Sequence, residues 1–293
     1  MKTIVTHMAP DVDAVSSVWL LKRFLPGWES ADVAFVPAGK TLGNEPVDSD
    51  PDILHVDTGM GILDHHQTGE DTCAAKRTME YISQVLKPKA KSQRPKDKIH
   101  KEFPDEAMER LVDVVNIIDH FKEVYFPNPT ADFYDFGLVG IMDGWKLIYS
   151  DDHLRIISHA MEALDGIYKA MQNKVWAERE IKENGVEFQS KWGKGIGIET
   201  INDETIRIAQ KSGYVIAVRK DPKKGYVRIK SLPDPRVDLT DCYNRYKEID
   251  KEATWFLHAG KNMVLNGSMK NPQTKATKLT LREIIEVLKS KSK

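Results

Sequence analysis

The chain of 293 residues lacks the features that mark several classes of protein. It has only two cysteines, Cys73 and Cys242, whose separation fits neither a disulfide framework nor a cysteine-rich metal site, so we expect two reduced thiols. No apolar run approaches the length of a membrane span, and the N-terminus lacks the apolar core of a signal peptide, which favours a cytoplasmic protein without a membrane partner. The formal net charge is −1, so any affinity for a polyanion requires a local basic groove.

The first half of the chain alternates short apolar stretches with stretches of helical periodicity. We expect strands at residues 2–6, 31–37 and 53–57. We expect helices at residues 14–25, 72–86, 106–121, 136–149 and 153–183. This alternation predicts an α/β domain with a parallel sheet and helices on both faces.

The composition becomes β-like after Asn184 and Gly185, which predicts two domains, residues 1–183 and 184–293. The second is expected to be a smaller α+β domain. Its expected elements are strands at 206–208, 214–219, 226–231 and 254–258, a hairpin turn at 221–225 and a final helix at 280–289.

Aspartates and histidines gather in four segments that each end an apolar element. The residues concerned are His7, Asp11, Asp13, Asp57, Asp64, His65 and His66, with Asp119 at the end of a helix. In parallel sheets, ligand sites form at the carboxyl ends of the strands. Carboxylates and imidazoles are the ligands that divalent transition metals take from proteins. Taken alone, Asp13 could be a helix cap and the His65–His66 pair could be structural, but the joint concentration of buried charge favours a metal site.

The order of these motifs resembles that of the DHH phosphoesterase superfamily. The motifs are His-x-x-x-Asp-x-Asp, Val-Asp-x-Gly, Asp-His-His and a later isolated aspartate, and they cover residues 7–119. The superfamily includes RecJ-type exonucleases, small-oligonucleotide and cyclic-dinucleotide phosphodiesterases, and manganese-dependent family II pyrophosphatases. The resemblance implies two divalent cations, Mn²⁺ first, with Mg²⁺ or Co²⁺ as substitutes.

The resemblance also implies a role for each motif residue. One cation would be held by His7, Asp11 and Asp57, and the other by Asp13, Asp57, His65 and Asp119. The implied catalytic residues are Asp57 as the bridging ligand, His66 facing the scissile phosphate, and Asp64 orienting the histidine pair. Two cations at such a site clamp the attacking and leaving oxygens of an in-line displacement.

A narrower resemblance is to the Myg-type branch, whose members resemble metal-dependent exonucleases acting on RNA. It rests on Gln67-Thr-Gly after the histidine pair, on Trp255–Gly260, on Asn266-Gly-Ser and on the strand from Tyr226 to Pro233. The Gly-Gly-His signature of many oligonucleotide-cleaving relatives is absent, and so is the Ser-Arg-Lys-Lys-type motif of the pyrophosphatases.

The second domain is expected to bind the substrate. Arg228 and Lys230 alternate on one strand, so both point to the same side and suit phosphate contacts, or else they form a solvated strand face. The other candidate substrate-binding residues are His66, His258, Lys261, Asn266, Gly267 and Ser268, where a plain turn is the alternative for the last five. The basic stretch 87–101 is either a solvated loop or a rim that attracts an anionic substrate.

These observations predict a metal-dependent phosphohydrolase with its site between the two domains. The expected reaction is cleavage of phosphodiester bonds in short or single-stranded nucleic acid, as in an exonuclease or oligonucleotide phosphodiesterase. The alternative enzyme is a small-molecule phosphoanhydride hydrolase, similar to a pyrophosphatase or exopolyphosphatase, with a nucleotide or phosphate substrate. A metal- or nucleotide-sensing module is the non-enzymatic alternative. The sequence does not determine the oligomeric state, and a homodimer is one possibility.

Overall fold

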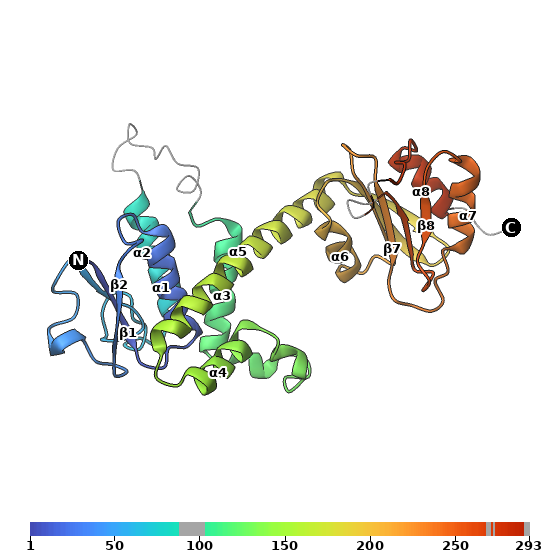
Figure 1. The fold of residues 1–293 in the computed structure, drawn as a ribbon. Coiled ribbons are helices and arrows are strands. Elements are labelled where there is room, and N and C mark those ends of the chain that lie inside the picture. Colours follow the sequence, from blue (N-terminus) through green and yellow to red (C-terminus); the bar gives the residue numbers. More distant parts are fainter. Residues whose placement is uncertain (88–102, 268–270, 272, 290–293) are drawn as a thin grey trace. The chain divides into compact units, whose positions relative to one another are not determined.

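The computed structural model describes residues 1–87, 103–267, 271 and 273–289. They form two compact units, Met1–Gln172 and Asn173–Lys293, here called unit 1 and unit 2 (Figure 1). The border between them falls inside a long helix, so the division expected at residue 184, and with it the cleft between domains, stays a prediction. The basic stretch expected to be a loop or rim lies outside the described residues from residue 88 on, as does Ser268.

Unit 1 contains a three-stranded sheet of order β2-β1-β3 in which both pairings are parallel. Its strands are β1 (Thr3–His7), β2 (Asp32–Val36) and β3 (Ile53–His55). Its helices are α1 (Val12–Phe24), α2 (Ala74–Leu86), α3 (Glu106–Asp119), α4 (Leu138–Tyr149) and the first part of α5 (His153–Asn184). This arrangement confirms the α/β prediction for the first half.

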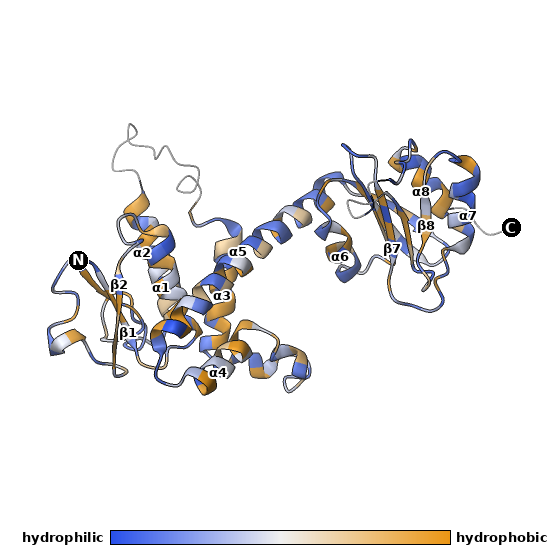
Figure 2. Ribbon diagram, in the orientation of Figure 1, coloured by the Kyte–Doolittle hydropathy of each residue, from blue (hydrophilic) through white to orange (hydrophobic). Residues whose placement is uncertain are grey.

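The core of unit 1 is built around α1, most of whose side chains are buried. Helices α2 and α3 pack against α1, and Figure 2 shows the hydrophobic residues along α3. Trp19 is fully buried, and its indole N–H donates to the carboxylate of Asp165 on α5 at 2.8 Å. Asp105 caps α3 and also accepts from Tyr168 and Gln172 of α5, both at 2.9 Å. These contacts join α1 and α3 to α5.

Unit 2 is an α+β unit with a six-stranded mixed sheet of order β4-β5-β6-β7-β9-β8. Its strands are β4 (Val186–Ser190), β5 (Gly193–Glu199), β6 (Ile216–Lys220), β7 (Val227–Ser231), β8 (Trp255–Leu257) and β9 (Met263–Asn266). Its helices are α6 (Glu204–Lys211), α7 (Thr240–Ile249) and α8 (Leu281–Lys289). Among these strands only the β5–β6 pairing is parallel, with α6 as the connection between the two.

Several elements of unit 2 differ from the sequence prediction. The expected strand at 206–208 is wrong, because these residues lie in α6. Ile206 and Ile208 have the spacing of a strand, yet both are buried in a short helix, where Ile206 packs with Ala209. Helix α7 and strands β4, β5 and β9 were not predicted. The strands at 214–219, 226–231 and 254–258, the hairpin turn at 221–225 and the final helix are confirmed.

Both cysteines are buried and unpaired, Cys73 in unit 1 and Cys242 in unit 2. Among the described residues, no helix is both long enough and apolar enough to cross a membrane.

Candidate metal centre

The ends of β1 and β3 place His7 and Asp57 side by side, because the two strands are parallel neighbours. Asp57 adopts a left-handed backbone conformation (φ 54°), which is uncommon for a residue with a side chain. Its N–H donates to the carbonyl of Leu63 at 3.2 Å, and Val56 pairs with Leu63 in an isolated bridge. Leu63 therefore lies beside the end of β3, and the residues that follow it, Asp64-His65-His66, lie next to Asp57.

His7 belongs to the first of the two ligand sets that the sequence predicts. Its Nε2 lies 3.2 Å from Oδ2 of Asp57 and 3.8 Å from Oδ2 of Asp11. Its Nδ1 lies 2.8 Å from the carbonyl oxygen of Met8, which can only accept, so Nδ1 carries the proton. Nε2 is then the nitrogen that faces the carboxylates, an orientation typical of metal-binding histidines.

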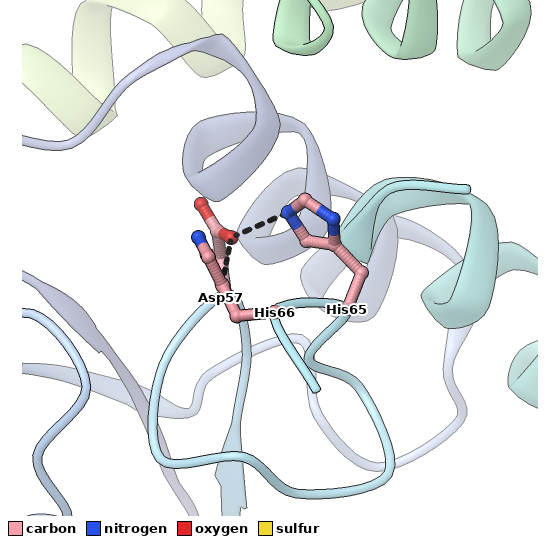
Figure 3. A group of neighbouring side chains, drawn as sticks. All are labelled: Asp57, His65 and His66. Atoms are coloured by element: carbon pink, nitrogen blue, oxygen red, sulfur yellow. Dashed lines mark ion pairs between the residues drawn. The ribbon is translucent and has the colours of Figure 1, made fainter. Parts of the chain in front are cut away.

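His65 belongs to the second set. Its Nε2 lies 3.5 Å from Oδ1 of Asp57, 3.5 Å from Oδ2 of Asp119 and 3.7 Å from Oδ2 of Asp13. Figure 3 shows His65 and His66 approaching the same oxygen of Asp57. The two oxygens of Asp57 thus face different sets, Oδ2 toward His7 and Oδ1 toward His65.

Helix starts hold two of the aspartates. Oδ1 of Asp11 accepts from the N–H groups of Asp13 and Ala14 at 3.0 Å, which caps α1 and leaves Oδ2 for the first set. Asp13 is fully buried in α1, and its carboxylate accepts from Ala74 and Ala75 at 2.7 and 2.8 Å. Asp11 is therefore the cap of α1, while Asp13 is fixed by the first N–H groups of α2, where a carboxylate is electrostatically favoured.

Asp64 orients its neighbours instead of joining the ligands. It is buried, its Oδ2 accepts from the N–H of Met60 at 2.7 Å, and its Oδ1 accepts from the N–H of His66 at 3.1 Å. The same Oδ1 lies 2.7 Å from Nδ1 of His66. The side chain of His66 is 54% exposed, so Asp64 contacts the ring at Nδ1 while the rest of the ring is accessible to solvent.

The charges of the site favour bound protons or cations. Burial lowers the pKa of His7, but hydrogen bonds and charges from Asp57, Met8 and Asp11 raise it overall to about 9. The carboxylate of Asp57, together with those of Asp119 and Asp13, raises the pKa of His65 to about 9 against the effect of its burial. Burial opposes ionisation of Asp57, yet the two imidazoles lower its pKa to about 2.

Asp13 and Asp119 show the opposite effect. Burial and the charges of Asp57 and Asp119 raise the pKa of Asp13 well above its ordinary value. Burial also raises the pKa of Asp119, although His65 opposes the rise. A cation would stabilise these carboxylates in their ionised form.

Two atoms at the centre of the site fit a cation directly. Oδ1 of Asp57 and Nε2 of His65 are buried and have no hydrogen-bond partner among the described residues. They face one another at 3.5 Å, too far for a strong hydrogen bond and suited to a shared ion. Three groups have ligand atoms within 4.8 Å of one another: His7–Asp11–Asp57, Asp13–His65–Asp119 and Asp57–His65–His66. The predicted ligands are thus brought together.

Replacement of Asp13 by asparagine is expected to stabilise the metal-free protein. The substitution removes the cost of burying an ionisable carboxyl whose pKa is raised by burial and by Asp57 and Asp119, and we expect this gain to exceed the loss of one of the two backbone hydrogen bonds that the carboxylate accepts. We expect the metal-free melting temperature to rise by about 2–4 °C, the shift that 1 kcal/mol produces in a domain of this size. Thermal unfolding followed by circular dichroism in EDTA measures the change, and the rise on adding Mn²⁺ should be lost.

Asp113, exposed on α3, provides the matched control, because Asp113→Asn makes the same chemical change away from the site. A melting temperature that falls in Asp13→Asn, or a full response to Mn²⁺ in that variant, would contradict the prediction.

Sequence reasoning did not find every residue around the site. The N–H groups of Ala74 and Ala75, which bind Asp13, lie about sixty residues from it in sequence. The one sequence signal for them was the helix start expected near residue 72, where free N–H groups occur. The ring of His120 lies 6.2 Å from that of His65, and its Nδ1 donates to the carbonyl of Asn116 at 2.9 Å. His120 therefore terminates α3 in a structural role beside the centre.

The expected substrate-binding residues of unit 2 separate into different environments. Arg228, Lys230 and Gly267 line one groove on the sheet. His258 and Lys261 are exposed in the turn between β8 and β9, where Lys261 pairs with Asp238 at 2.9 Å.

Asn266 does not face a substrate. It is fully buried, and its amide nitrogen donates to the carbonyls of Thr254 and Lys275 at 2.9 and 3.1 Å. Its amide oxygen accepts from the N–H of Thr277 at 2.7 Å. The expectation of a substrate contact at Asn266 is therefore wrong, because this side chain satisfies backbone groups inside unit 2.

No sequence profile of a known family and no curated protein sequence matches the chain. Among solved structures, the chain is similar to a DHH-domain protein described as a member of the S1p family of ribosomal proteins, at 12% identity and a TM-score of 0.31 over 98% of this chain and 85% of that one. It is also similar to the exonuclease RecJ bound to manganese, at 12% identity and a TM-score of 0.30 over 98% and 89%. RecJ from Thermus thermophilus with Mg²⁺ matches at 12% and 0.29, over 92% of this chain and 47% of that one.

Proposed function

We propose that the chain is a metal-dependent phosphohydrolase of the DHH phosphoesterase superfamily, which cleaves phosphodiester bonds in short or single-stranded nucleic acid. The main support for the proposal is that two His/Asp sets meet at Asp57. Oδ1 of Asp57 and Nε2 of His65 face one another there, and both are buried without a hydrogen-bond partner among the described residues. Residues 7–13, 57–66 and 119 come together there, and the same residues form the motifs that resemble those of the superfamily. A cation would stabilise the ionised carboxylates of Asp13 and Asp119, whose raised pKa values reflect the cost of burying them without one.

The residues present fit two divalent cations of the Mn²⁺ type. His7, Asp11 and Asp57 would hold one, and Asp13, Asp57, His65 and Asp119 the other. When bound, such a pair acidifies a water and neutralises charge on the phosphoryl oxygens.

The chain itself supplies the orientation of the reacting groups. Asp64 holds Nδ1 of His66 at 2.7 Å, so Nε2 is the ring nitrogen left for a phosphoryl group. A ring nitrogen in this position can form a hydrogen bond to the leaving oxygen or exchange a proton with it. The first N–H groups of α2 hold the carboxylate of Asp13, which would keep this ligand in place during the reaction.

Asp64→Asn is expected to lower kcat by about 10- to 100-fold, the usual effect of losing an orienting partner of a metal site. The amide retains most of the shape but is a weaker acceptor for Nδ1 of His66, so it orients the ring less firmly. Because the described hydrogen bonds of Asp64 reach no member of the two ligand sets, the dissociation constant for Mn²⁺ should change little. Steady-state kinetics together with Mn²⁺ titration calorimetry separates the two effects. An equal loss of metal affinity would show that Asp64 acts on the ligands instead.

The proposed function is tested by turnover with Mn²⁺ on labelled single-stranded RNA and DNA 10-mers and, in parallel, on pyrophosphate. Stepwise shortening of an oligonucleotide with intact pyrophosphate supports the proposal. Phosphate release from pyrophosphate with intact oligonucleotides would contradict it and place the activity with small phosphoanhydrides. The Asp57→Asn protein, prepared in the same way, shows whether any turnover belongs to this site.

A further inference from the structure

One face of the unit 2 sheet is only partly covered by helices. Helices α7 and α8 pack on the opposite face against the residues Ile216, Val218, Val227, Ile229 and Val264. On the first face, α6 packs on β5 and β6 through Ile196, Ile198, Ile206, Ala209 and Ala217. Figure 1 shows α6 on one side of the sheet and α7 and α8 on the other. Beyond β6, no described helix of unit 2 packs on this face.

The uncovered part, here called the open face, consists of Arg228 and Lys230 on β7, Met263 and Leu265 on β9, and Phe256 on β8. The register sets these side chains in rows, because paired residues of neighbouring strands point to the same side. Arg228 pairs with Leu265, which pairs with Phe256, and Lys230 pairs with Met263. Each row thus combines a cation with apolar groups.

Phe256 is the unusual member of the open face. Its side chain is 54% exposed, although its strand neighbours Trp255 and Leu257 face the covered side. An exposed phenyl ring in line with a guanidinium offers a stacking surface beside a phosphate-binding group. The core of unit 2 does not require this arrangement.

A groove of about 670 Å³ lies on the same face and is lined by five cationic side chains and two carboxylates. The cations are Arg219, Lys223, Lys224, Arg228 and Lys230. Asp203 holds both arginines, at 2.7 Å from Nε of Arg219 and 3.2 Å from Nη1 of Arg228. Cations outnumber the carboxylates, so the groove favours an anionic ligand on a protein with almost no net charge.

We propose that the open face and its groove form a binding site for single-stranded nucleic acid. Phe256 stacks on an unpaired base, and Arg228 and Lys230 bind backbone phosphates. In a duplex the base faces are stacked on one another and cannot contact Phe256, and a small phosphate compound has no base to stack on it. A single strand offers both an unpaired base and backbone phosphates. The inference rests on the proposed function, since it names the form of the substrate and where unit 2 binds it.

The experiment is binding of a fluorescent single-stranded RNA 10-mer to the full chain in EDTA, followed by anisotropy at several salt concentrations. We expect Phe256→Ala to weaken binding by about 5- to 100-fold, the range for loss of one stacked base. Phe256→Trp should bind as well as the wild type. Phe256→Leu keeps an apolar side chain, so weaker binding by that variant isolates the loss of stacking from any loss of folding.

Lys230→Gln should reduce the slope of log affinity against log salt by about 0.7, the contribution of one phosphate contact on a single strand. Lys247→Gln is the matched control, because Lys247 is exposed on α7, which packs on the covered face. It loses the same charge and should lower the slope much less.

The outcomes separate this inference from the proposed function. If the wild type shortens the 10-mer with Mn²⁺ but Phe256→Leu and Lys230→Gln bind it normally, the open face is not the binding site and the proposed function stands. If these variants lose affinity while the wild type cleaves no nucleic acid, the binding site stands and the proposed function fails.

Discussion

Asp57→Asn should abolish nearly all hydrolysis, with turnover reduced by about 1,000-fold or more. Asp57 lies between the two ligand sets, 3.2 Å from Nε2 of His7 and 3.5 Å from Nε2 of His65. Loss of one carboxylate therefore affects both proposed cations, whose charge stabilisation is worth several kcal/mol in such reactions. Each loss of about 1.4 kcal/mol lowers the rate tenfold, which gives the expected magnitude.

The measurement is kcat/KM on the oligonucleotide that the wild type cleaves, together with Mn²⁺ affinity by calorimetry. Asp113→Asn serves as the control of equal chemistry and should retain full activity, because Asp113 is exposed and outside both sets. A folded Asp57→Asn protein with more than a tenth of the wild-type turnover would remove the central support for the metal centre.

The second large effect expected is a steep rise of metal affinity with pH. The pKa values of His7 and His65 are raised to about 9, so both rings are protonated at pH 7. A cation requires the unprotonated nitrogen and must displace both protons. Affinity for Mn²⁺ should therefore increase by up to about 100-fold per pH unit below pH 9 and level off above it.

Calorimetry at pH 7 in two buffers of different ionisation enthalpy counts the protons released, and about two are expected. His7→Gln should lower the number to about one, whereas His159→Gln, on α5 beside Trp145, should not change it. Binding without proton release, at an affinity independent of pH, would exclude this charge arrangement.

The same raised pKa values determine how the metal-free protein responds to pH. Protonated His7 and His65 stabilise the fold fully below their ordinary pKa of 6.5, and this contribution disappears as the pH rises through about 9. Asp13 acts in the same direction, because its raised pKa means that ionisation costs stability. Thermal unfolding in EDTA should therefore occur at lower temperature at pH 9.5 than at pH 7.

Much of unit 1 and of its candidate site could be predicted from the sequence. Apolar runs with helical or strand period are local signals, and the motif residues lie at the ends of such runs or shortly after them. His7 and Asp57 end elements whose parallel pairing follows from the alternation of strands and helices. The chemistry of the ligand types then indicates a metal without any knowledge of distances.

Unit 2 was less predictable because its elements are short and the surroundings decide their state. Ile206 and Ile208 fit a strand as well as a helix, and packing of α6 on β5 and β6 selected the helix. Asn266 resembles a ligand-binding turn residue in sequence, but the strands and loops around it use its amide for their own backbone groups.

The sequence by itself thus determined which residues are candidates for the chemistry of this protein, since residue type and position relative to an apolar run are local properties. Only the tertiary structure decided that Asp13 is held by the start of α2, that Asp57 offers one oxygen to each set, and that Phe256 lies in line with Arg228. The physical reason is that each of these contacts joins segments far apart in the chain. Their distances are fixed by packing and by strand register, which no local pattern contains.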